Sequence, residues 1–124
     1  MTMTQILDGM IDEFAGTQCD ELLGVAESST RNAVFFAMMR SGGRWFRFTI
    51  DAGVLFLDPS GDPASSGDVG DEDEVLDLLP AGGPVEIESI QFHDGVLKIA
   101  LVETGSIQFS EDVETSMMKI SYSR

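Results

Sequence analysis

Short apolar and aromatic runs, separated by turns rich in glycine, constrain the fold of this chain most strongly. Between residues 22 and 57 the runs read LLGVAE, AVFFAMM, RWFRFTI and VLFL, and the last third adds VEIESIQF, VLKIALV, SIQF and MMKISY. Runs of this length and composition are typical of β-strands. In RWFRFTI, Phe46, Phe48 and Ile50 share one side of the predicted strand. This alternation predicts one buried face and one face that is at least partly solvated.

The turns between these runs predict how the strands pair. Ser41-Gly42-Gly43 and Asp51-Ala52-Gly53 are short enough to close antiparallel hairpins, because glycine readily adopts the positive φ that tight hairpin turns require. Asp94-Gly95 and Thr104-Gly105 carry the same signal in the last third. The sequence therefore predicts a mainly antiparallel meander.

Two segments have the spacing of helices. Residues 5–15 are expected to form an amphipathic helix that ends at Gly16, and its apolar face would consist of Ile6, Leu7, Met10, Ile11 and Phe14. The segment from Asp71 to Leu79 is compatible with one short second helix, because acidic residues fill its first turn. The predicted fold class is therefore α+β, with an amino-terminal helix packed on a mainly antiparallel β-sheet of roughly six to eight strands.

Size and charge limit the classes of partner. The 124 residues suit a single domain spanning 1–124, and 43% hydrophobic residues with a mean hydropathy of +0.07 argue against wholesale disorder. The chain carries 22 acidic and 7 basic residues, a net charge of -15. Such a field repels nucleic-acid phosphates and anionic lipid, so direct binding to nucleic acid or to a membrane is not expected. It attracts a basic protein partner, although acidity also serves solubility alone.

The location of the protein is predicted from the same sequence. Cys19 is the single cysteine, so no intramolecular disulfide can form. The amino terminus lacks the basic start and apolar core of a signal peptide, and no run of 18 apolar residues occurs. A cytoplasmic location is expected, and the oligomeric state stays open.

Recognisable catalytic chemistry is missing from the sequence. His93, the single histidine, lies in the turn HDG and is expected to be an ordinary turn residue. Cys19 is expected to be a buried or semi-buried small hydrophobe whose pKa is raised by Asp20 and Glu21. One cysteine and one histidine cannot build a conventional zinc site, and no glycine-rich phosphate-binding motif occurs. The sequence predicts a protein that is not an enzyme and uses no cofactor.

The most strongly charged segment supplies the candidate binding site. Residues 58–74, DPSGDPASSGDVGDEDE, are expected to form a mobile acidic loop, and eleven acids with no base lie between residues 51 and 90. A calcium site of the EF-hand kind fits poorly, because Ala64 occupies a ligand position. A cationic surface would instead relieve this density of like charge. The residues predicted to bind the partner are Asp58, Asp62, Asp68, Asp71, Glu72, Asp73, Glu74 and Asp77.

A second candidate surface is basic and aromatic. Arg44, Trp45 and Arg47 lie within one predicted strand and could stack on a nucleobase or grip a carboxylate. This alternative requires a concave pocket on their face. The simpler interpretation is that the arginines neutralise part of the acidic surface and cover the tryptophan.

The segments VEIESIQFHDGVLKIALVETGSIQF and RWFRFTIDAGVLFL resemble strands of small acidic immunity proteins of bacterial polymorphic toxin systems, including contact-dependent and type VI secretion systems. The resemblance implies an α+β protein that neutralises a cognate toxin by covering its active site, and nuclease-like or deaminase-like toxins of this kind are typically basic. It assigns no individual residue. Two alternatives stay open: an inhibitor that imitates nucleic acid and captures a DNA- or RNA-binding protein, and a small-ligand-binding domain using the Arg44, Trp45 and Arg47 face.

Overall fold

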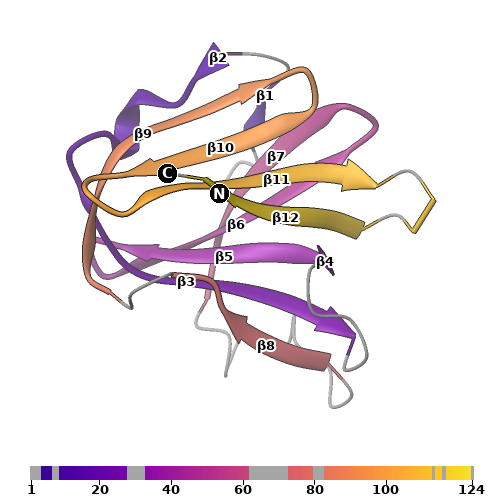
Figure 1. Ribbon diagram of the computed structural model, residues 1–124, viewed down its shortest axis with the longest axis horizontal. Helices are drawn as coiled ribbons and strands as arrows, with labels where there is room; N and C mark the ends of the chain where they lie inside the picture. The colour runs from indigo at the N-terminus through magenta and orange to yellow at the C-terminus, as the bar shows by residue number, and fades with distance from the viewer. Residues whose placement is uncertain are drawn as a thin grey trace.

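Antiparallel strands make up almost all of the regular structure in the computed structural model (Figure 1). Within the described residues there are twelve strands and one three-residue 3-10 helix, η1 (Asp12–Phe14). The residues that the structure describes are 4–6, 9–27, 33–61, 73–79, 83–112, 114–115 and 117–123.

The first layer is built from consecutive hairpins in the first half of the chain. Its strand order is β1-β7-β6-β5-β3, and β8 pairs with part of the other edge of β3. The predicted turns are confirmed, because Gly42-Gly43 joins β5 to β6 and Ala52-Gly53 joins β6 to β7. The strands are β1 (Thr4–Ile6), β3 (Gln18–Glu27), β5 (Phe36–Ser41), β6 (Arg44–Asp51), β7 (Val54–Ser60) and β8 (Asp73–Asp77).

The second layer comes mainly from the last third of the chain. Its order is β9-β10-β11-β12-β4, and β2 pairs with β9 at the other edge. The predicted Asp94-Gly95 turn joins β9 to β10, with Asp94 at a φ of 51° and Gly95 at 76°. The strands are β2 (Gly9–Met10), β4 (Ala33–Val34), β9 (Val85–His93), β10 (Val96–Leu101), β11 (Gly105–Asp112) and β12 (Met117–Ser123).

Two corners join the layers. At one corner the start of β3 pairs with β9, through Gln18 with Glu86 and Cys19 with Val85. At the other corner β4 pairs with β12 and then, after a bend at Phe35, the chain continues as β5, which pairs with β3. Strands that change partners at a bend are a common way to fold one sheet over another.

The inner faces of both layers bury one hydrophobic cluster. Phe14 of η1 meets the ring of Phe46 edge to face at 4.9 Å and so closes one part of the cluster. The alternation expected in RWFRFTI is present, because Phe48 and Ile50 are buried whereas Trp45, Arg47 and Thr49 are partly solvated. The largest fully buried side chains of this cluster are Phe48, Phe92, Phe109, Leu22, Met39, Leu55, Ile87, Ile90, Leu97, Ile99 and Ile107.

The predicted amino-terminal helix over residues 5–15 is wrong. Gly9 has a φ of +132°, which lies outside the helical region, and β1 and β2 pair with different layers. Ile11 and Phe14 are buried, but Met10 is 59% exposed. An isolated helix of this length gains little stability on its own. Ile11 and Phe14 reach the core instead from the end of β2 and from η1.

The second predicted helix is also wrong, because residues 73–77 form β8. β9 covers only the start of β3, at residues 18 and 19, so the backbone of residues 23–27 needs another partner along that edge. The described chain is therefore a β-rich fold with more strands than the six to eight predicted, and the α+β class is overturned. Within the described segments, no helix has the length and apolar character that crossing a membrane requires.

The prediction of a mobile acidic loop over residues 58–74 is wrong at both of its ends, which form strands. Its first three residues belong to β7 and its last two belong to β8. These residues form strands because their backbones pair with β6 and β3, respectively. Residues 62–72 lie outside the described residues.

Candidate functional site

The acidic strand β8 is held against β3 by backbone pairing and by two leucines. Its register places Asp77 opposite Leu23 and Val75 opposite Val25. Beyond the strand, the backbone amide of Leu78 donates to the carbonyl of Leu22 at 2.8 Å. The side chains of Leu78 and its neighbour Leu79 are both buried and anchor this end of β8 in the core.

β3 has a glycine, Gly24, at the point where β4 and the end of β8 pack closely over it. Gly24 faces the core, and a Cβ atom there would lie 2.5 Å from a methyl carbon of Val34 and 3.1 Å from one of Leu78. Glycine is thus the residue that lets β4 and the end of β8 pack over the middle of β3.

The second layer also holds the end of β8. The hydroxyl of Tyr122, on β12, donates to the carbonyl of Leu78 at 3.0 Å. Burial raises the pKa of Tyr122, and the negative charge of Asp77 raises it further. Tyr122 is still 54% exposed, so an accessible aromatic residue lies next to the acidic strand.

Two carboxylates of β8 lie apart from the basic residues of the described chain. No described Lys or Arg is within ion-pair distance of Glu74 or Asp77. Asp77 accepts one hydrogen bond, from the backbone amide of Leu79 at 3.1 Å. Val75 lies between the two acids and is 43% exposed. This group of Glu74, Val75 and Asp77, which we call the β8 edge, presents an apolar side chain flanked by negative charge.

Asp58 belongs to a different part of the surface. Its carboxylate is 3.3 Å from the guanidinium of Arg47 on the neighbouring strand. In register across the sheet, Asp58 is followed by Arg47, Met38, Leu23 and Asp77. Four strand spacings therefore separate Asp58 from Asp77, about 19 Å at the usual spacing between strands.

The structure thus places some of the predicted binding residues together and not others. Asp73, Glu74 and Asp77 share β8, whereas Asp58 is distant from them and paired. The remaining predicted residues lie outside the described residues, and they are Asp62, Asp68, Asp71 and Glu72.

The basic alternative does not form one face. Arg44 is on the same side of β6 as Phe46, over whose ring its guanidinium lies at 5.9 Å, while Trp45 and Arg47 point to the other side. The cation over Trp45 is Arg40, at 5.9 Å, and Arg40 is also 3.4 Å from Glu21. Sequence reasoning did not pair Arg40 with Trp45, although the two-glycine turn between β5 and β6 fixes that register.

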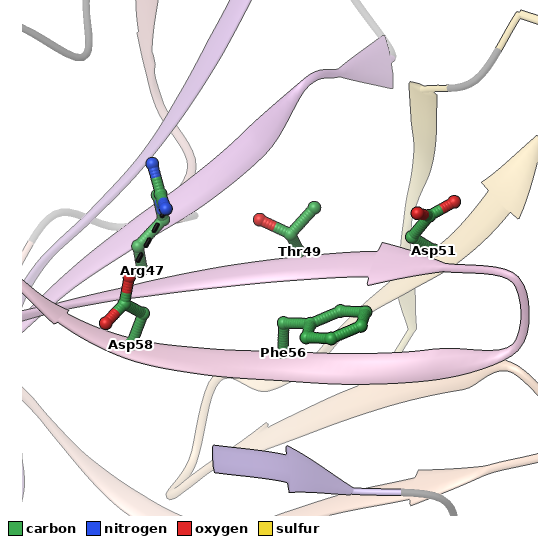
Figure 2. A pocket seen from close by; sticks show the side chains of 5 residues that line it. All are labelled: Arg47, Thr49, Asp51, Phe56 and Asp58. Carbon is green, nitrogen blue, oxygen red and sulfur yellow. Dashed lines mark hydrogen bonds and ion pairs between the residues drawn. The ribbon is translucent and has the colours of Figure 1, made fainter. Parts of the chain in front are cut away.

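A pocket does lie on this outer face (Figure 2). Figure 2 shows that Arg47, Thr49 and Asp51 come from β6, whereas Phe56 and Asp58 come from β7. The guanidinium of Arg47 is already bonded to Asp58 and lies over the ring of Phe36 at 5.5 Å. With two carboxylates and one paired arginine, the pocket is poorly suited to hold an anionic ligand.

Cys19 and His93, the single cysteine and the single histidine, lie in different surroundings. Cys19 is fully buried, as expected, and burial raises its pKa to about 12 with smaller contributions from Asp20 and Asp77. His93 is exposed at the end of β9. No three His, Cys, Asp or Glu side chains of the described residues come together in a way that could hold a metal ion.

Comparisons with known proteins do not place the chain in a family. No protein-family model matches it, no curated protein matches it, and no solved structure matches it.

Proposed function

We propose that this chain is a cytoplasmic immunity-type inhibitor that binds a basic toxin protein and neutralises it by covering its active site. One observation carries the proposal: Glu74 and Asp77 flank the exposed Val75 on an outer strand, and no described Lys or Arg is within ion-pair distance of either acid. Elsewhere on the sheet, arginines already pair with carboxylates, as Arg47 does with Asp58.

The distinction between paired and unpaired acids matters for recognition. A carboxylate that already pairs with an arginine contributes little net field, whereas an unpaired one attracts an approaching cation over about a Debye length. Such steering raises the association rate of a basic partner. An exposed apolar side chain within the charged strand can then be desolvated at the centre of the contact.

The small-ligand alternative has weaker support. Its pocket lies beside Arg47, whose guanidinium is bonded to Asp58 and covers Phe36. A ligand would have to displace that carboxylate before it could use the cation.

The proposal is tested by co-expressing this chain with the product of the adjacent gene. We expect that product to be toxic alone and harmless with this chain. The double variant Glu74→Gln, Asp77→Asn should protect less well. The double variant Glu86→Gln, Glu88→Gln removes the same charge from exposed positions on β9 and serves as the matched control.

Two outcomes would contradict the proposal. In the first, the adjacent product is not toxic, or it stays toxic beside a folded wild-type chain. In the second, the β8 and β9 double variants lose protection equally, which would mean that overall charge and not the β8 edge is recognised.

A further inference from the structure

The backbone of β8 has one edge that no described residue pairs with. The amide of Leu78 bonds to Leu22, and backbone groups of an antiparallel strand alternate in direction, so Leu76 and Glu74 also face β3. By the same alternation, the N–H and C=O groups of Val75 and Asp77 point away from β3. In Figure 1, β8 is the lowest strand of its layer, with β3 on its upper side.

The side chains along this edge differ between its two faces. Val75 and Asp77 lie on the same face as Val25 and Leu23, the residues opposite them on β3. Glu74 lies on the other face, because consecutive side chains of a strand alternate. A strand added to β8 would therefore meet a carboxylate on each face and an exposed valine between them.

Charge decides which kind of strand fits. A second copy of β8, paired antiparallel about Val75, would place Asp73 opposite Asp77, and like charges directly opposite each other destabilise a sheet. A segment carrying Lys or Arg would place cations opposite Glu74 and Asp77 instead. We propose that β8 receives an extended cationic segment of the bound partner as an additional strand, an inference that rests on the proposed function and specifies its mode of contact.

A proline at position 75 tests the backbone contact without changing the charge. The amide of Val75 points away from β3, so Val75→Pro removes no hydrogen bond between β8 and β3, whereas Leu76→Pro would remove one. Met10→Pro is the matched control. Met10 is also an exposed apolar residue on an edge strand, and its amide points away from β9, because the neighbouring amide of Ile11 donates to Ile90.

The direct probe is a short peptide of valine and threonine that carries two lysines three positions apart, which is the spacing of Glu74 and Asp77 and places one lysine on each face of the added strand. Amide NMR spectra of the wild-type chain are recorded as the peptide is added, together with amide exchange rates. We expect saturable shifts at Val75 and Asp77, slower exchange of both amides, and weaker binding as salt is raised. Val75→Pro should weaken binding about tenfold or more, and Met10→Pro should not.

A second variant guards against misfolding of the proline chain. Val75→Lys keeps the backbone amide but places a cation in the path of a cationic strand, so it should also weaken binding. The inference is overturned if the shifts lie elsewhere, if a peptide with a central proline binds equally well, or if the added species is a second copy of this chain. In the co-expression assay, protection retained by a folded Val75→Pro chain would overturn strand addition and leave the proposed function standing. Absence of protection by the wild-type chain would instead overturn the proposed function.

Discussion

Glu111, on β11, holds the tight turn at Gly53 on the opposite layer. One carboxylate oxygen accepts the backbone amide of Gly53 at 3.1 Å, and the other accepts the amide of the preceding Ala52 at 2.9 Å. Both turn residues have positive φ, 52° and 76°, as expected of a two-residue hairpin turn. A carboxylate is well matched to two such adjacent donors, so this contact ties the β6–β7 hairpin to the second layer.

Replacing Glu111 with glutamine should lower the stability of the fold. The side-chain amide keeps one acceptor oxygen, but its NH2 group cannot accept the second backbone donor. Because the site is exposed, we expect a loss of about 1 kcal/mol in the free energy of unfolding, measured by urea denaturation. Glu114→Gln removes the same charge from a nearby exposed turn and should change stability little. Equal losses in the two variants would contradict a role for the paired hydrogen bonds.

The hairpins were predictable because their signals are local. Alternating apolar residues and glycine turns fixed the runs from Leu22 to Leu57 and those of the last third, and these runs are strands. The amino-terminal helix was predicted wrongly, because the helical spacing of apolar residues is ambiguous. Ile11 and Phe14 have that spacing, yet they reach the core from the end of a strand and from a 3-10 turn. The second helix was predicted wrongly because β8 pairs with the part of β3 that β9 leaves unpaired. That pairing depends on contacts between residues distant in sequence.

For the candidate site, too, local features could be predicted from the sequence and contacts between distant residues could not. An acidic surface could be predicted from the density of Asp and Glu, since charge needs no knowledge of the fold. The pairing of Asp58 with Arg47, and its distance from Asp77, required the register of five strands. Strand alternation alone puts Arg44 on the opposite side of β6 from Trp45 and Arg47, so a face shared by all three could have been rejected from the sequence. The packing of Phe36 under Arg47 could not be foreseen, because it depends on the pairing of β5 with β6.

Gly24→Ala should destabilise the protein through overpacking. The added methyl would lie 2.5 Å from a Val34 side-chain carbon and 3.1 Å from one of Leu78, and both side chains are buried. We expect a loss of about 1–3 kcal/mol in the free energy of unfolding. Val34→Ala makes space at the same point, so the double variant should lose less than the sum of the two single losses. Strict additivity in this double-mutant cycle would contradict the proposed contact.

Cys19 should react slowly with thiol reagents while the chain is folded. Its side chain is fully buried and its pKa is raised from 9.0 to about 12, so the folded state holds little thiolate at neutral pH. We expect labelling to be much slower in buffer than in concentrated urea. The raised pKa contributes stability below pH 9.0, and this contribution is lost as the pH rises from 9.0 towards 12. Cys19→Ser, with a group of higher pKa, should lack that loss, and fast labelling of the folded chain would contradict the burial.

Asp58 and Asp77 should contribute differently to partner binding. Asp77→Asn removes a charge that no described Lys or Arg pairs with, so we expect slower association with the proposed toxin partner and a weaker dependence of that rate on salt. Asp58→Asn removes a charge already balanced by Arg47 and should change the rate less. Stopped-flow measurements at low and high salt compare the two variants. A larger effect for Asp58→Asn would move the interface to the outer face of β6 and β7.

Tyr122 is the single tyrosine, so its ionisation can be followed directly by ultraviolet absorbance. Burial and then Asp77 raise its pKa above the ordinary value of 10.0, and its hydroxyl donates to Leu78. We expect a titration midpoint above 10.0 in the folded chain, which falls in Asp77→Asn but not fully to 10.0, because burial persists. The neutral phenol is the form favoured by folding, so this contribution to stability is present below pH 10.0 and is lost as the pH rises through the folded pKa. Glu88→Gln controls for the removal of one negative charge. An unchanged midpoint in Asp77→Asn would contradict the placement of this carboxylate beside the tyrosine.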